Sequence, residues 1–400
     1  MIKRIISGEL ATIIAIMGLA NMAMAVLQPV LPLYLTSIGM VPSIIGLMLA
    51  VGMVGMVFGE STGGWVADKL GLKIPLSVGT FICAPLVLSF ILASGTPSIF
   101  LIFLFWGVVR SAIFGPARGY IGNTASLSNK ATLIAVYMAS QSVARSIGSL
   151  ASGFIADNLG YSGDFYFSAG ISILAGTLVF VGLKKIPLLK HDIPAVSVSH
   201  TLPPSPDRPK VNYRLFIIQC VIVILFLLGG GINSFLPLLA KEVVGVEATQ
   251  VGILFTIGGL VNTIMLIPLG RLADRMDKRT LMVLGLLLGA VGMAGIAYTR
   301  TYPLLVLFTV INNISFAMYT PAAVALLSNT IPAYWQSTGM GIYGAAEDVG
   351  IIIGSSAAGF IWTAWGPSSA YLIGMASSVL GAIVCLVFIK GGAVPKGAGV

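Results

Sequence analysis

Long apolar runs alternate with short polar segments along the whole chain. A bilayer core about 30 Å thick is crossed by roughly 20 apolar residues in a helix, and twelve runs of that length are present, separated by polar or Gly/Pro-containing turns. We therefore predict an all-α membrane protein with twelve transmembrane helices. The predicted spans lie near residues 10–35, 44–67, 74–94, 98–122, 132–155, 165–184, 213–239, 250–270, 280–298, 303–327, 338–362 and 369–389.

The first apolar run imitates a cleavable signal peptide. Lys3 and Arg4 precede it, and it passes through the small-residue stretch from Asn21 to Ala25. The apolar character continues to Leu35, which makes the run long enough to cross a membrane. We therefore predict that this run is retained as the first transmembrane helix.

One long polar stretch interrupts the pattern of spans. Residues 185–212 contain six prolines and few apolar residues, a composition that cannot bury a core. We predict that this stretch is a cytoplasmic linker between two six-helix halves, residues 1–184 and 213–390, and that residues 391–400 form a cytoplasmic tail.

The two predicted halves repeat the same residue types at a separation of 205 or 206 residues. A register this steady over six spans indicates two copies of one unit with the same topology. Such copies are related by an axis along the membrane normal, which places a transport site near the midplane. The matched pairs are Pro32 and Pro237, Gly46 and Gly252, Gly64 and Gly270, Asp68 and Asp274, Pro116 and Pro321, Gly148 and Gly354, Gly153 and Gly359, and Gly160 and Gly366.

Composition and charge agree with this prediction. Hydrophobic residues make up 57% of the 400-residue chain and charged residues only 9%, too few to cover the surface of a soluble domain. If both termini are placed in the cytoplasm, 17 Lys and Arg residues lie on that side and only Lys241 and Arg300 lie outside. This bias predicts a multi-pass protein of the cell membrane with both termini inside. It also explains the net charge of +9 without a nucleic-acid partner.

The cysteines do not indicate a metal site or a disulfide. Cys83, Cys220 and Cys385 all lie inside apolar runs, without CxxC spacing or a nearby histidine. The spans also lack a set of nucleophilic or metal-binding residues typical of a membrane enzyme, and their charges are too asymmetric for a channel filter. We therefore expect neither enzymatic activity nor a cofactor.

Two related loops carry the strongest local pattern. They read Gly64-Trp-Val-Ala-Asp68-Lys69-Leu-Gly71-Leu-Lys73 and Gly270-Arg-Leu-Ala-Asp274-Arg275-Met-Asp-Lys278-Arg279. Both resemble the loop signature of the major facilitator superfamily, in which GxxxD is followed by a basic residue, a glycine and a second basic residue. Together with the span count, the linker and the repeat, the resemblance covers essentially the whole chain. The second copy departs from the signature, because Asp277 replaces the later glycine.

The resemblance implies alternating access, with these loops latching the two halves on the cytoplasmic side. Gly64 would allow close approach of a neighbouring helix, and Asp68 would pair with a helix N-terminus or with Arg118. Lys69 and Lys73 would hold the loop at anionic headgroups. A simple orientation signal is the alternative. The predicted latch residues are Gly64, Asp68, Lys69, Gly71, Lys73, Arg118, Gly270, Asp274, Arg275 and Arg279.

The first span resembles the drug:proton antiporter branch of the superfamily through its Pro29-Val-Leu-Pro32 element. We predict that Asn21 and Gln28 on this span face a substrate cavity, although a packing kink would also explain the prolines. The antiporter motif of the fifth span is matched only at Gly148 and Gly153, so the direction of transport stays open.

Six charged residues fall inside the predicted spans, where each is costly unless it is paired or faces water. Arg110 resembles an arginine of the antiporter branch, and we predict that it lines the substrate cavity together with Arg145. We predict proton coupling at Glu60, Glu347 or Asp348, with a structural ion pair as the alternative. Glu347 and Asp348 are adjacent on a helix, so at most one of them faces the cavity squarely.

Two functions fit these observations. The first is proton-coupled efflux of small organic or drug-like compounds by a secondary antiporter. The second is uptake or exchange of a small organic anion or another metabolite, which the intramembrane arginines favour because guanidinium binds carboxylate and phosphate. In both cases the expected partners are a small-molecule substrate, protons and membrane lipids, and the protein is expected to act as a monomer.

Overall fold

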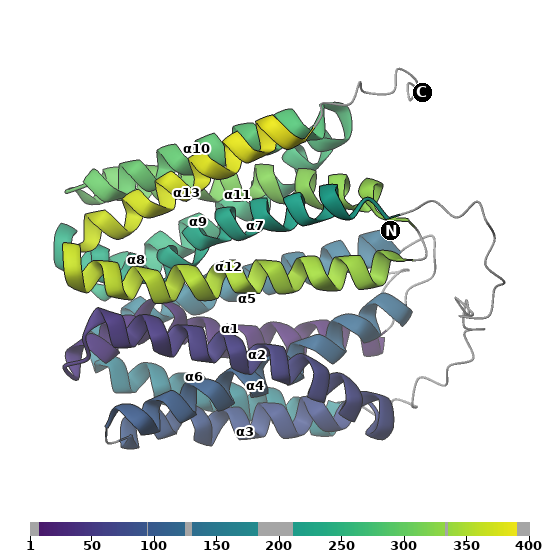
Figure 1. The fold of residues 1–400 in the computed structure, drawn as a ribbon. Helices are drawn as coiled ribbons and strands as arrows, with labels where there is room; N and C mark the ends of the chain where they lie inside the picture. Colours follow the sequence, from purple (N-terminus) through teal and green to yellow (C-terminus); the bar gives the residue numbers. More distant parts are fainter. Residues whose placement is uncertain (1–7, 94, 125–129, 183–210, 333–334, 390–400) are drawn as a thin grey trace. The chain divides into compact units, whose positions relative to one another are not determined.

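The computed structural model describes residues 8–93, 95–124, 130–182, 211–332 and 335–389 (Figure 1). This part of the chain holds twelve long helices, which confirms the predicted fold class. Eleven of them are long and apolar enough to cross a membrane, and the twelfth, α5, is richer in polar residues. The helices are α1 (Gly8–Ser37), α2 (Pro42–Leu70), α3 (Lys73–Leu92), α4 (Thr96–Thr124), α5 (Lys130–Leu159), α6 (Tyr161–Gly182), α7 (Tyr213–Ile232), α9 (Ala248–Arg275), α10 (Lys278–Tyr298), α11 (Tyr302–Thr330), α12 (Gln336–Trp365) and α13 (Pro367–Phe388).

The seventh span is interrupted toward its C-terminal end. After α7 the chain passes through a 3₁₀ turn, η2 (Asn233–Phe235), the short α8 (Leu236–Leu239) and a π turn, η3 (Ala240–Val244). Three consecutive glycines precede Ile232, the last residue of α7, and Pro237 in α8 has no backbone N–H to donate. The hydrogen-bond pattern of a regular α-helix therefore changes at this point.

The chain folds into two compact units, and neither is continuous in sequence. Unit 1 comprises Met1–Met40, Leu47–Asp192 and Gly245–Leu260, and unit 2 comprises the rest of the chain. Each unit thus holds one six-helix repeat, except that the start of α2 belongs to unit 2 and the first part of α9 belongs to unit 1.

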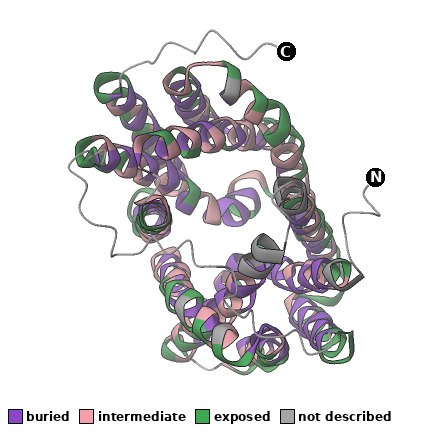
Figure 2. Ribbon diagram, turned by 90° about the vertical axis from the view of Figure 1, so that its right-hand side faces the viewer, coloured by how far each residue is buried: buried purple, intermediate pink, exposed green. Residues whose placement is uncertain are grey.

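Equivalent helices pack in the same way inside the two units. In unit 1, α1 contacts α5 and α6, and α3 contacts α4 and α6; in unit 2, α7 contacts α12 and α13, and α10 contacts α11 and α13 (Figure 1). Glycines allow the closest of these contacts: a Cβ at Gly148 of α5 would lie 2.7 Å from the carbonyl oxygen of Met22 in α1. Buried residues lie on helix faces turned toward neighbouring helices (Figure 2).

The turns repeat as well. Gly39 and Gly245 have φ values of 88° and 76°, and Gly160 and Gly366 have φ values of 71° and 84°. Only glycine adopts this region without strain. Each pair is separated by 206 residues, the spacing at which the two halves repeat in sequence.

Aromatic side chains fill the core of unit 1 near one end of the bundle. The rings of Phe90 and Phe165 are stacked with centroids 5.7 Å apart, and the ring of Phe103 meets Phe90 edge-on at 5.3 Å. The hydroxyl of Tyr34 donates to the carbonyl oxygen of Phe90 at 2.9 Å. Helices α1, α3, α4 and α6 are therefore held together by this cluster.

Candidate functional site

Two of the predicted latch residues make contacts inside their own units. Lys73, at the start of α3, donates from Nζ to the carbonyl oxygen of Phe180 at 2.8 Å. Arg279, at the start of α10, donates to the carbonyl oxygen of Leu386. Phe180 and Leu386 lie in the last turns of α6 and α13, where carbonyl groups lack partners within the helix. These two basic residues therefore cap the last helix of each repeat.

The glycines of the predicted latch differ in their surroundings. Among the described residues, a Cβ at Gly64 or at Gly270 would meet no atom within 4 Å, so a close helix approach at Gly64 stays a prediction for the latched state. A close approach lies one and five residues earlier, where Gly63 and Gly59 contact the backbone of α4. Gly71 has a φ of 83° and makes the turn into α3.

The other predicted latch residues include two exposed basic side chains and three side chains that the structure does not describe. Lys69 lies over the ring of Trp65, with its Nζ 4.2 Å from the centroid, and Arg275 is exposed at the end of α9. The side chains of Asp68, Arg118 and Asp274 lie outside the described part of the structure, so their role in a latch stays a prediction.

The predicted cavity residues of unit 1 lie on three helices. Asn21 of α1 is half-buried and donates to the carbonyl oxygen of Gln141 on α5 at 3.1 Å. The guanidinium carbon of Arg110 lies 5.6 Å from the centroid of the Trp106 ring, within the range of a cation–π contact. Arg145 on α5 and Gln28 on α1 are exposed. The bond between Asn21 and Gln141 lies in the contact of α1 and α5. That the four side chains line one cavity stays a prediction.

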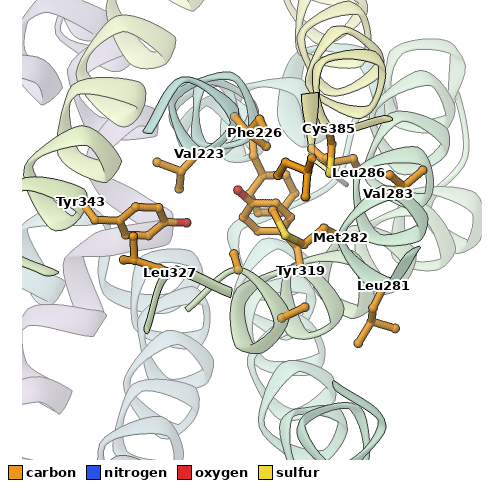
Figure 3. Packing of buried hydrophobic residues seen from close by; sticks show 14 of the residues in the cluster. Val223, Phe226, Leu281, Met282, Val283, Leu286, Tyr319, Leu327, Tyr343 and Cys385 are labelled. Carbon is orange, nitrogen blue, oxygen red and sulfur yellow. The ribbon is translucent and has the colours of Figure 1, made fainter. Parts of the chain in front are cut away.

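Glu347 belongs to a buried polar cluster in unit 2 that includes two tyrosines. The hydroxyl groups of Tyr319 on α11 and Tyr343 on α12 point toward one another inside an otherwise apolar core (Figure 3). The two rings are 1% and 3% exposed, and Glu347, one turn after Tyr343, acts electrostatically on both. Glu347 is half-buried and Asp348 lies beside it. An acid in these surroundings has polar neighbours but little water.

Glu60, the third predicted proton carrier, lies in unit 1. Its side chain is exposed on α2, and its Cγ would lie 3.9 Å from a Cβ at Gly115 on α4. Glu60 therefore packs across the same glycine-mediated contact between α2 and α4 as Gly59. Its surroundings are more open than those of Glu347.

Four asparagines that we did not predict meet near the middle of unit 2. Asn233 in η2 donates from Nδ2 to Oδ1 of Asn312 on α11 at 2.8 Å, and Asn262 on α9 donates to the carbonyl oxygen of Asn313 at 3.4 Å. All four side chains are only partly buried. Each amide has more than one donor and acceptor position, so these side chains retain capacity to bind a polar group. Asn312 lies about 15 Å along α11 from its first residue, at 1.5 Å per residue.

No group of three or more His, Cys, Asp or Glu side chains suitable for a metal ion is found within the residues that the structure describes. The three cysteines are unpaired, and two of them, Cys83 and Cys385, are buried.

Comparisons with known proteins place these features in a family context. The model of the Major Facilitator Superfamily matches residues 13–228 and again residues 215–398. The chain is 20% identical over 368 residues to the MFS-type transporter MJ1560 of Methanocaldococcus jannaschii, covering 91% of this chain and 94% of the relative. It is 23% identical over 363 residues to the quinolone resistance protein NorA of Staphylococcus aureus, covering 90% and 91%.

Solved structures of similar fold include two transporters. The nucleoside transporter NupG matches with a TM-score of 0.76 and 16% identity, over 95% of this chain and 98% of that one. The xylose transporter XylE from E. coli, in an inward-open conformation, matches with a TM-score of 0.73 and 16% identity, over 96% of both chains. At this identity the match concerns the fold alone.

Proposed function

This chain belongs to the major facilitator superfamily and is a multi-span membrane transporter, and from this premise we propose that it exports small organic or drug-like compounds in exchange for protons. Both termini lie in the cytoplasm in this proposal, and transport proceeds by alternating access. The full-length similarity to NorA, whose name associates it with quinolone resistance, supports the choice of efflux.

The observation that carries the proposal is the cluster around Glu347. Glu347 is half-buried among apolar helices and lies next to two buried tyrosines. Its ionised form is costly in these surroundings. In this proposal the carboxylate takes up or releases a proton when its exposure to water or to a neighbouring charge changes. The partly buried asparagines of the same unit add hydrogen-bonding groups to aromatic and aliphatic surfaces. Such a mixture of polar and apolar groups suits amphipathic organic molecules rather than ions alone.

The alternative is transport of a small organic anion. Arg110 and Arg145 of unit 1 favour it, because guanidinium groups bind carboxylates and phosphates with two parallel hydrogen bonds. Arg145 is exposed on α5 and is therefore accessible to a solute.

Transport in proteoliposomes separates the two functions. With an acidic lumen, the efflux antiporter accumulates a lipophilic cationic dye or a fluoroquinolone from the medium, and collapse of the pH gradient releases it. An organic-anion transporter instead exchanges a labelled carboxylate for an unlabelled one without any gradient. Absence of gradient-driven dye accumulation, combined with anion counterflow, would reject export of drug-like compounds.

A further inference from the structure

Asp164, in the first turn of α6, is the most deeply buried acid described in the structure. Its exposed fraction is 0%, and neither carboxylate oxygen makes a hydrogen bond of normal geometry. The polar groups that act on it are the buried hydroxyl of Ser152 and the carboxylate of Asp157, both on α5. Burial of an ionised carboxylate without a counter-ion costs far more than burial of the neutral acid. In this conformation Asp164 therefore requires a proton.

No Lys, Arg or His side chain is among the groups found to act on Asp164 within the described residues. No Lys, Arg or His occurs in α1 or α6, and Lys73 of α3 is bound to the opposite end of α6. Tyr34 of α1 lies nearby, since its ring meets Phe165 edge-on with centroids 4.9 Å apart, and Tyr161 lies beside Tyr34. Arg145 of α5 is two turns before Ser152 and exposed. The other acid that acts on Asp164 is Asp157 on α5, so this neighbour supplies no counter-ion.

Asp157 connects this region to the start of α9. Its two carboxylate oxygens accept from the backbone N–H of Ala248 at 3.1 Å and of Thr249 at 2.7 Å. These N–H groups have no partner inside α9, and a carboxylate at a helix N-terminus is favourable. Gly153, adjacent to Ser152, lets the two helices approach, because a Cβ there would lie 2.7 Å from the Cα of Thr249. The contact between α5 and α9 therefore involves Gly153 and Asp157, which neighbour on α5 the Ser152 that acts on Asp164.

The other repeat provides an internal comparison. In unit 2 the start of α2 packs on α12 in the same way, and Ser43 donates its N–H to Oγ1 of Thr363 at 3.2 Å. At the 206-residue spacing Ser152, Asp157 and Asp164 correspond to Ala358, Thr363 and Ala370. Ala370 is also fully buried. The packing of this fold thus needs no acid at the position of Asp164.

We propose that Asp164 binds a proton when the start of α9 is packed on α5 and releases it when these two helix ends separate and water reaches the carboxylate. Closing then takes up one proton from water, and opening returns it. This inference rests on the proposed function, because alternating access supplies the separation. A one-proton linkage changes the closed-to-open ratio by at most about ten-fold per pH unit.

Spin labels at the ends of the two helices test the proposal. Leu159 ends α5 and Glu247 precedes α9, and both are exposed, so Leu159→Cys and Glu247→Cys are introduced after the native cysteines are replaced by alanine. The distance between labels is measured from mildly acidic to mildly alkaline pH. We expect the short distance to dominate at acidic pH in this background. With Asp164→Ala, which copies Ala370, the distribution no longer depends on pH.

Asp277→Asn is the matched control, because this acid caps α10 in unit 2. It leaves the pH response unchanged. Infrared difference spectra of the unlabelled protein supply a second measurement: the band of a neutral carboxylic acid is lost in Asp164→Asn. A wild-type pH response retained in Asp164→Ala, or no response in the wild-type background, would overturn the proposal. If the response is present but no proton-driven transport is found, the proposed function fails and the proton site stands.

Discussion

Lys73 and Arg279 show how a single contact changes the interpretation of a motif residue. Both belong to loops that resemble a family signature for coupling the two halves. In the structure each reaches across its own unit to the last turn of α6 or α13. In these contacts, Lys73 and Arg279 therefore stabilise their own repeats.

Replacement of Lys73 or Arg279 by alanine should lower thermal stability. A charged side chain at a helix C-terminus stabilises by about 0.3–1 kcal/mol, so we expect a small decrease in the unfolding temperature in detergent, measured by scanning fluorimetry. Lys69→Ala in the same loop is the control and should change less. Loss of transport at unchanged unfolding temperature would instead assign these residues to the latch.

Substitution of Glu347 by glutamine should separate transport from its driving force. The amide mimics the protonated acid permanently, so gradient-driven accumulation is lost while exchange of labelled for unlabelled substrate continues. Asp348→Asn and Glu60→Gln, measured in the same proteoliposome assay, should retain accumulation because Glu347 is the acid beside Tyr319 and Tyr343. Accumulation by Glu347→Gln would move the carrier to one of the other two.

The sequence predicted Glu347 as a candidate because a charge stands out in an apolar run. The asparagines of unit 2 do not stand out in this way, since an uncharged amide costs less in a span, and only the folded helices bring Asn233 and Asn312 together. Asp164 was missed for a different reason. The predicted sixth span began at residue 165, whereas α6 begins at Tyr161 and buries the acid in its first turn.

At the scale of elements, glycines decide where helices touch. Three glycines of α2 that contact the backbone of α4 recur every four residues, at Gly55, Gly59 and Gly63, and so lie on one face of the helix. Gly64 lies next to this row and meets open space. Hydropathy alone does not distinguish these positions, because the identity of the facing helix depends on tertiary structure.

Gly59→Ala and Gly64→Ala should therefore change the stability of the protein in opposite directions or by different amounts. A Cβ at position 59 overlaps the backbone of Val108, and overpacking of this kind costs about 1–3 kcal/mol. A Cβ at position 64 has room, and alanine favours a helix over glycine by up to about 1 kcal/mol. Unfolding temperatures in detergent measure both. Equal destabilisation by the two substitutions would contradict the packing described for α2 and α4.

For the whole molecule, periodic hydropathy was sufficient to predict the number and the approximate limits of the long helices. The broken end of the seventh span was not predicted, although Gly229, Gly230, Gly231 and Pro237 mark it in hindsight. The sequence also did not predict that the start of α2 belongs to unit 2 and the start of α9 to unit 1. This assignment depends on contacts between residues about 90 to 320 positions apart.

Membrane orientation yields a prediction for the whole chain. With both termini in the cytoplasm, the turn at Gly366 faces outside and the turn at Asp277 faces inside. Single cysteines at these turns, in a background without native cysteines, should react with a membrane-impermeant maleimide in intact cells only at residue 366. The reverse labelling pattern would invert the proposed orientation.

The discontinuous units also constrain how the protein is made. On the ribosome the first repeat emerges complete long before residues 245–260, which belong to unit 1. Until those residues are synthesised, the backbone amides that donate to the carboxylate of Asp157 and the helix that packs on Gly153 are missing from the nascent chain. In unit 2 the order of synthesis is reversed: residues 41–46 are already in the membrane when α12, on which they pack, is inserted. Unit 1 therefore matures after its own repeat has been inserted, and a chain truncated before residue 245 should be a better substrate for quality-control proteolysis than one truncated after residue 260.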